Sequence, residues 1–236
     1  MPVRPVRGVG LAASIAVGAV AVCSLLSLAS TLVGRSLAER AAGTGDQDNL
    51  LVAALVEVAT AVPFVVAYLA AIGLVIVWTY RARRNLDAFP GVLPGYSAGW
   101  AIAGWLVPFV NFVIPAQVMR DIAQSSLRRG GSGRLVALWW GSWLVFLVGG
   151  RWADRVSSRE FDRLPESPTL RSEFYDYADH YTASFNRNLL PTLAGLVAGA
   201  TLIVLIRRIS AAQHARMRSG EPYGPVVPGM TVPSPE

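Results

Sequence analysis

The chain has 236 residues, of which 53% are hydrophobic and only 15% charged, and its mean hydropathy is +0.44. Since a soluble domain usually carries about 25% charged residues, this composition excludes an ordinary soluble domain and predicts an integral membrane protein. The formal net charge is +6 and every basic residue is an arginine, but no basic stretch is interleaved with aromatic residues, so nucleic acid is not an expected partner.

The apolar residues gather into blocks instead of spreading along the chain. A helix needs about 20 residues to cross the hydrocarbon core, so most of these blocks are candidate spans. The first block has a run of about 25 apolar residues, which is too long for a cleaved signal peptide, so we expect it to remain as the first span. The blocks cover residues 8–33, 50–80, 98–119, 135–150 and 189–206.

The end of the second block indicates the orientation of the chain. Trp78 and Tyr80 are typical of the membrane interface, and Arg81, Arg83 and Arg84 follow at once. Arginines gather on the cytoplasmic side of membrane proteins. We therefore expect a multi-pass protein of the cell membrane with a cytoplasmic N-terminus.

The third block, 98–119, is long enough to cross the bilayer, yet it contains Pro108 and Pro115 with Asn111 between them. Prolines break helices, and asparagine side chains pair with the open backbone groups of turns. If this block enters the membrane and returns, thirteen arginines lie on the side of the N-terminus and eight on the other; if it crosses, the division is eleven to ten. The positive-inside rule therefore favours four transmembrane helices with a re-entrant or kinked helical hairpin, and five transmembrane helices are the alternative.

The only sizeable polar region is the insert at 151–188. Its second half places aromatic side chains at helical spacing, which predicts an interfacial helix at 173–188 that lies on the membrane or docks on the bundle. The aromatic stripe consists of Phe174, Tyr177, Tyr181 and Phe185. We expect residues 1–218 to form a single polytopic membrane domain that includes this insert, and the Pro/Gly-rich residues 219–236 to form a disordered tail.

A set of spaced residues begins with Trp78-x-x-Arg81 and Asn85, continues with Gly99-Trp100-x4-Trp105-x-x-Pro108-x-x-Asn111-x3-Pro115 and ends with Asp121. It resembles the bacterial membrane family called domain of unknown function 4328. The resemblance runs from about residue 50 to residue 215 and includes the later pairs Trp139-Trp140 and Ser210-x-x-Gln213. It implies a multi-pass helical membrane domain and no activity. The residues that carry its main motifs, and that we single out as candidate structural or functional positions, are Trp78, Arg81, Asn85, Gly99, Trp100, Trp105, Pro108, Asn111, Pro115 and Asp121.

The sequence contains no nucleophile–base pair, metal cluster, Walker-type loop or dinucleotide fingerprint, so it predicts no cofactor and favours a non-enzyme. We expect a non-catalytic membrane module that scaffolds or senses through the helix at 173–188 and the cytoplasmic ends. Its partners would be the lipid bilayer and another membrane protein or a second copy. The alternative is a small transporter or channel-like subunit with a polar site at the broken helix around Asn111.

Overall fold

The computed structural model describes residues 4–89, 92–127 and 132–219, and within these ranges the chain is helical and contains no strand. The predicted tail at 219–236 lies outside the described residues, apart from Ser219. The elements are α1 (Arg7–Thr44), α2 (Asp48–Leu86), α3 (Trp100–Leu106), η1 (Val110–Phe112), α4 (Ile114–Ser126), α5 (Ser132–Phe161) and α6 (Arg171–Ser219).

Four of these helices, α1, α2, α5 and α6, are long and apolar enough to cross a membrane. Each contains one long stretch without a charged residue, and hydrophobicity sustained over such a length is the signature of a transmembrane helix. The prediction of an all-α membrane bundle with four spans is therefore confirmed. The uncharged stretches are 8–34, 58–80, 135–150 and 188–206.

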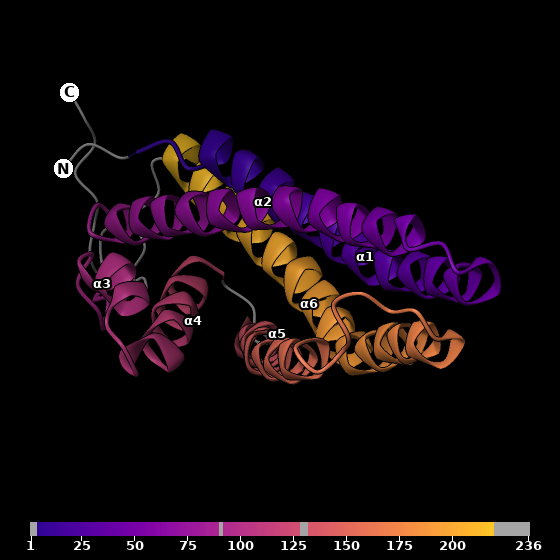
Figure 1. Cartoon of the computed structure of the whole chain (residues 1–236). Helices are drawn as coiled ribbons and strands as arrows, with labels where there is room; N and C mark the ends of the chain where they lie inside the picture. Colours follow the sequence, from indigo (N-terminus) through magenta and orange to yellow (C-terminus); the bar gives the residue numbers. More distant parts are fainter. Residues whose placement is uncertain (1–3, 90–91, 128–131, 220–236) are drawn as a thin grey trace, which may run out of the picture.

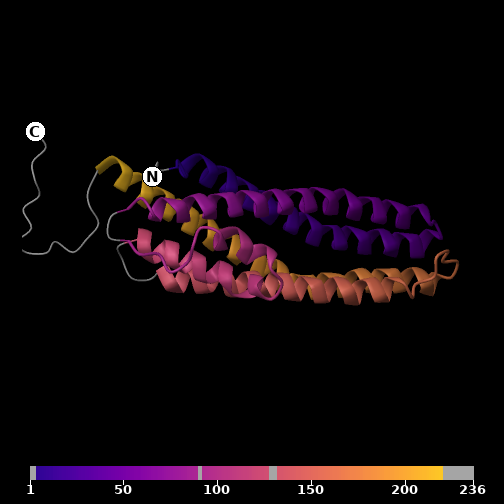
Figure 2. The ribbon, with the colours of Figure 1, turned by 90° about the vertical axis from the view of Figure 1, so that its left-hand side faces the viewer.

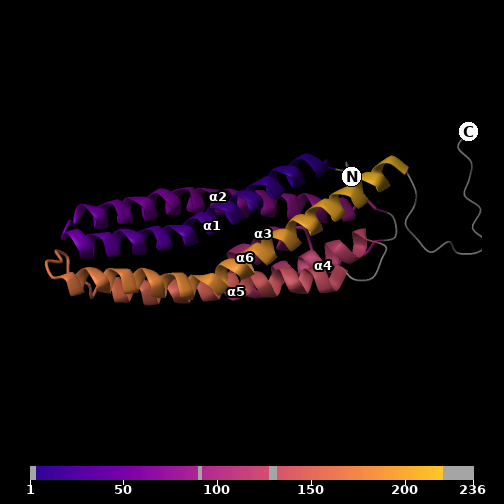
Figure 3. The same cartoon turned by 90° about the vertical axis from the view of Figure 1, so that its right-hand side faces the viewer.

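The long helices pack in the order α2, α1, α6, α5, and each runs antiparallel to its neighbour (Figures 1 and 3). Helices α2 and α5 therefore form the two edges of the bundle. The short helices α3 and α4 form a hairpin that contacts both edges at one end of the molecule. The start of α1 and the end of α6 lie at this same end, which we call the terminal end, whereas the turns after α1 and α5 lie at the opposite, distal end (Figure 2).

The helices are longer than a bilayer is thick. With 38 residues, α1 measures about 57 Å at about 1.5 Å per residue, whereas the hydrocarbon core is about 30 Å thick. At the terminal end, α1, α2 and α5 extend only a few residues beyond their uncharged stretches, so most of their excess length lies at the distal end. Helix α6 extends beyond its uncharged stretch at both ends. We call the excess length at the distal end the distal extension, and it comprises residues 35–44, 48–57, 151–161 and 171–187.

Aromatic side chains of α6 hold the distal extension together. Phe174, Tyr177 and Tyr181 are buried against small side chains of α1 and α2. At Gly34 of α1, a Cβ would lie 2.6 Å from the ring of Tyr181, so only glycine allows the two helices to approach this closely. The small side chains in these contacts are Ala38, Ala41, Ala42 and Ala53.

Residues 173–188 are therefore the first part of α6 and not a separate interfacial helix. Of the two arrangements expected for this segment, docking on the bundle is the one observed, because α1 and α2 cover its aromatic face. The helix continues directly into the last span, and Pro191 lies inside it. Membrane helices tolerate such a proline when neighbouring groups pair with the backbone carbonyl that loses its hydrogen bond.

The third apolar block forms a broken hairpin. Helix α3 has 7 residues and α4 has 13, about 10 and 20 Å, so neither crosses a bilayer and the described residues contain no fifth spanning helix. The break occurs at Pro108: Val107 before it is extended, as residues before proline tend to be, and Phe109 after it has a φ of 63°. Pro115 does not break a helix, contrary to our expectation. It lies in the first turn of α4, where its missing N–H is not needed.

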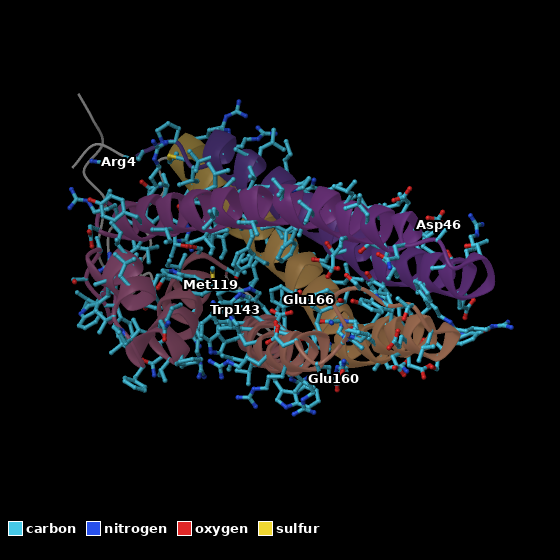
Figure 4. All side chains as sticks on the ribbon, viewed as in Figure 1. Arg4, Asp46, Met119, Trp143, Glu160 and Glu166 are labelled. Atoms are coloured by element: carbon cyan, nitrogen blue, oxygen red, sulfur yellow. The ribbon has the colours of Figure 1, made fainter. Side chains whose placement is uncertain are left out.

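The two ends of the molecule differ in charge. Among the described residues, the terminal end carries eleven arginines but only two acidic residues, Asp87 and Asp121. The distal end carries eight arginines and eleven acidic residues. In Figure 4, Arg4 and Asp46 lie at these opposite ends. The terminal arginines are Arg4, Arg7, Arg81, Arg83, Arg84, Arg120, Arg134, Arg207, Arg208, Arg216 and Arg218.

Single cysteines introduced into a Cys23→Ser background test this topology. Cysteines at Ala88, after α2, and at Ser132, at the start of α5, should face the same side of the membrane, and a cysteine at Ser167 should face the other side. The positive-inside rule predicts that the first two are protected from a membrane-impermeant thiol reagent in intact cells, whereas the third reacts. Labelling of positions 88 and 132 on opposite sides would contradict the hairpin.

Candidate functional site

A buried polar network lies at the terminal end of the bundle. Trp78 is fully buried, and its indole N–H donates a hydrogen bond to the hydroxyl of Ser210 at 3.0 Å. At Gly10 of α1, a Cβ would lie 2.9 Å from that hydroxyl oxygen and 3.1 Å from the indole nitrogen. The glycine thus lets α1 pass directly over the hydrogen bond that joins α2 to α6.

Asn85 is the centre of this network. Its side-chain oxygen accepts a hydrogen bond from the backbone N–H of Arg4 at 2.8 Å, and its amide nitrogen donates to the backbone oxygen of the same residue at 2.9 Å. The amide also donates to the side-chain oxygen of Gln213 at 3.2 Å. Asn85 therefore fixes the segment before α1 as well as α6.

Gln213 joins α6 to two further elements. Its side-chain amide donates to the carbonyl of Ala82 of α2 at 3.0 Å and to the hydroxyl of Ser126, the last residue of α4, at 3.1 Å. Arg216, one turn later, donates to the carbonyl of Ser125 at 2.8 Å. Both Asn85 and Gln213 are buried, 1% and 0% exposed, and both have their polar atoms paired, so the network is suited to holding helices together and not to binding a ligand.

Arg81, the arginine of the sequence motif, lies at the edge of the buried network. Arg83, two residues later, is more buried than Arg81. The guanidinium of Arg81 reaches the carbonyl of Pro5 at 3.5 Å. Arg83 is buried, pairs with Asp87 at 2.7 Å and donates to the carbonyl of Tyr96. Arg83 thus ties α2 to the connection that leads to the hairpin, a role that the sequence motif does not indicate.

A tryptophan of α3 packs against two tryptophans of α5. The ring of Trp105 meets those of Trp140 and Trp143 edge-on, with centroids 6.1 and 5.8 Å apart, and Trp140 stacks on Trp143 at 4.7 Å. The indole N–H of Trp140 donates to the carbonyl of Phe112 in η1 at 3.0 Å. These contacts attach the hairpin to α5.

The other motif residues of the hairpin make few side-chain hydrogen bonds with the rest of the bundle. Gly99 and Trp100 lie exposed at the start of α3. The turn after Pro108 is closed by a hydrogen bond from the backbone N–H of Asn111 to the carbonyl of Val107 at 3.1 Å. Among the described residues, the side-chain oxygen of Asn111, one carboxylate oxygen of Asp121 and the indole nitrogen of Trp105 are buried without a hydrogen-bond partner. The side-chain oxygen of Asn111 therefore does not make the turn contact that we expected.

A second polar cluster lies in the distal extension. The guanidinium of Arg187 forms a two-pronged ion pair with Glu160 of α5 and donates to the hydroxyl of Ser157 at 3.3 Å. His180 lies 3.9 Å from the same carboxylate. Burial lowers the pKa of His180, while the charge of Glu160 opposes this shift and that of Arg187 adds to it. The imidazole is therefore largely neutral near pH 7.

Nearby, burial raises the pKa of Tyr181 to about 12, with a smaller contribution from the negative charge of Glu57. The phenol therefore stays protonated. Within the described ranges, no group of three or more His, Cys, Asp or Glu side chains is arranged to hold a metal ion. Among the described residues, no hydrogen bond joins a hydroxyl group of either cluster to His180. The contacts that are present join one helix to another.

Comparison with known proteins supports the resemblance seen in the sequence. The model of the family described as Domain of unknown function (DUF4328) matches residues 42–211, which confirms the expected family. No curated protein and no solved structure matches the chain. The matched region contains Asn85 and Ser210 but ends before Gln213.

Replacement of Asn85 or Gln213 by alanine should lower the thermal unfolding midpoint of the purified protein. Each change leaves a buried polar partner unpaired, which costs about 1–3 kcal/mol. The double variant should lose less stability than the sum of the single variants, because the two side chains belong to one network. Gln124→Ala, an exposed position on α4, is the matched control. An effect of Asn85→Ala no larger than this control would contradict the role of the network.

Acidification should loosen the distal extension through His180. Because its pKa in the folded protein is below its ordinary value of 6.5, the unfolded chain binds more protons as the pH falls through this range, and folding becomes less favourable. Protease cleavage within 171–187 should therefore be faster at about pH 5.5 than at about pH 7.5, relative to an unstructured substrate. His180→Gln should weaken this dependence, whereas His214→Gln, at the other end of α6, should retain it.

Proposed function

We propose that this chain, which belongs to the family described as Domain of unknown function (DUF4328), is a non-catalytic membrane module that scaffolds or senses through its distal extension. The observation that supports this most is the continuity of the four long helices, which pass from uncharged stretches into the extension without a break in helical structure. A displacement of the distal extension would thereby move the membrane-spanning stretches, because the same helices form both.

The charge distribution supports a cytoplasmic terminal end. The terminal end carries eleven of the described arginines and the distal end eight, and the positive-inside rule places the side with more arginines in the cytoplasm. In this orientation the distal extension stands on the opposite side of the membrane. The extension, and not the terminal end, would then meet external partners.

The hairpin is proposed to re-enter the membrane from the cytoplasmic side. Its tip carries no charged residue and exposes large apolar side chains, among them Leu106 at 70% and Phe109 at 85%. Such a surface is unfavourable in water and favourable in hydrocarbon. Arg120 and Asp121 lie nearer the terminal end, about 10 Å from the start of α4, which suits a shallow entry.

The surface that would meet a partner is the outer face of the distal extension. The aromatic face of 171–187 is used within the molecule, whereas Tyr175, Asp176 and Asp179 on the same helix are exposed. The extension exposes acidic side chains such as Asp176 and Asp179 and basic ones such as Arg155 and Arg159. A charged protein surface is therefore a better match than a lipid headgroup layer, and the partner could be a membrane protein or a second copy of the chain.

A small transporter or channel-like subunit has less support. The spanning stretches of α1, α2, α5 and α6 contain no charged residue, and the side-chain oxygen of Asn111 is buried at the tip of the hairpin with no polar neighbour within hydrogen-bonding distance among the described residues. A polar pathway would need several spans to converge on one polar site.

Site-specific photo-crosslinking in native membranes tests the proposed function. A photoreactive residue at Asp176 should give an adduct of defined mass, whereas the same residue at Leu193, on the exposed face of the last span, should not give that adduct. Gly34→Leu should abolish the adduct, because a side chain there displaces Tyr181 and separates the helices of the extension. Absence of any adduct from the extension, together with solute flux through proteoliposomes, would favour the transporter instead.

A further inference from the structure

We infer that the bundle holds one acyl chain of a membrane lipid in an aromatic cavity between α2 and α5. The cavity has a volume of about 80 Å³ and is lined by residues of α1, α2, α3, α5 and α6. Its large side chains are Tyr68, Trp105, Trp139, Trp143 and Phe146. Figure 4 shows Trp143 on the side of α5 that faces the hairpin and α6.

The cavity exists because α2 and α5 are the two edges of the bundle. They contact each other little, and the hairpin bridges them only near the terminal end. Farther along, Tyr68 of α2 and Phe146 of α5 meet across the gap with their ring centroids 6.1 Å apart. Both side chains are only partly buried, so they form a rim between the cavity and the surroundings of the bundle.

The lining is chemically suited to hydrocarbon. The hydroxyl of Ser24, one of its few polar groups, is already paired with the carbonyl of Val20 at 2.8 Å. Apolar cavities of this kind remain dry, and a cavity of about 150 Å³ lined by aliphatic and aromatic side chains is large enough to bind benzene. The present cavity is about half that size, so it accepts a few methylene groups of a chain that enters from outside.

The position of the cavity indicates that its occupant is a lipid chain. All of the lining residues lie in the uncharged stretches of the spans or in Trp105 of the hairpin, at the depth where the surrounding medium is lipid hydrocarbon. The rim at Tyr68 and Phe146 faces sideways between two helices. A lipid chain therefore reaches the rim without leaving its own medium, and filling the void restores dispersion contacts that an empty cavity would lose.

Tryptophan fluorescence in vesicles of dibrominated phosphatidylcholine tests this inference, because bromine quenches indoles that an acyl chain contacts. Three of the seven tryptophans line the cavity. The variant Ala21→Phe fills the cavity from α1, whereas Ala19→Phe, two residues earlier, adds the same side chain on the exposed face of the same helix. We expect the quenched fraction to fall by about a third or more in Ala21→Phe and to stay at the parent value in Ala19→Phe, since quenching follows contact with hydrocarbon.

The retained lipid can be counted directly by native mass spectrometry after transfer of the protein to detergent. The parent and Ala19→Phe should carry one phospholipid more than Ala21→Phe. If Ala21→Phe does not fold, Ser24→Leu fills the same cavity one turn farther along α1. Equal quenching and equal lipid counts in the parent and a folded cavity-filling variant would overturn the inference. Preferential quenching of the parent by aqueous acrylamide, showing water in the cavity, would overturn it as well.

Discussion

The hydrogen bonds of Asn85 are the interaction on which the arrangement of the terminal end depends. This one side chain pairs with both backbone groups of Arg4 and with Gln213, and Gln213 in turn reaches Ser126 at the end of α4. Because Asn85 and Gln213 are buried, each of these groups would be costly if unpaired. The network therefore permits one register of α2, α4 and α6, and the positions of the hairpin and the segment before α1 follow from it.

The hairpin in turn determines the shape of the membrane part. Since α2 and α5 contact each other little, the bundle would be open along one side without a further element. The hairpin closes only part of that side, through Trp105 and through the hydrogen bond from Trp140 to Phe112. The tryptophan pair of the family motif on α5 is thus explained by packing, and the aromatic cavity is what this partial closure leaves behind.

Hydropathy predicts the four spans because a long apolar segment in a membrane satisfies its backbone hydrogen bonds by forming a helix. Pro108 correctly predicts the break in the third block. The continuation of α6 through 173–188 is not predictable in the same way, because an amphipathic stripe has the same spacing whether it faces lipid or α1. Asn85 is 81 residues from its partner Arg4 and 128 residues from its partner Gln213 in sequence, and nothing local indicates which groups will meet. The role of Pro115 is not predictable from sequence for a similar reason. A proline interrupts a helix when its missing N–H is needed for a helical hydrogen bond, but it fits the first turn of a helix, where that N–H has no partner.

The charge difference between the two ends also supports the proposed position of the distal extension outside the membrane. An arginine near an anionic leaflet contributes about 1 kcal/mol of attraction, and an acidic side chain is repelled by the same surface potential. The distal end has more acidic residues than arginines, so laying its helices flat on acidic headgroups would gain little. Burying Phe174, Tyr177 and Tyr181 against α1 and α2 gains apolar contact without that electrostatic cost. The amphipathic segment therefore continues the line of the last span, and Asp176 and Asp179 on its opposite face are left exposed.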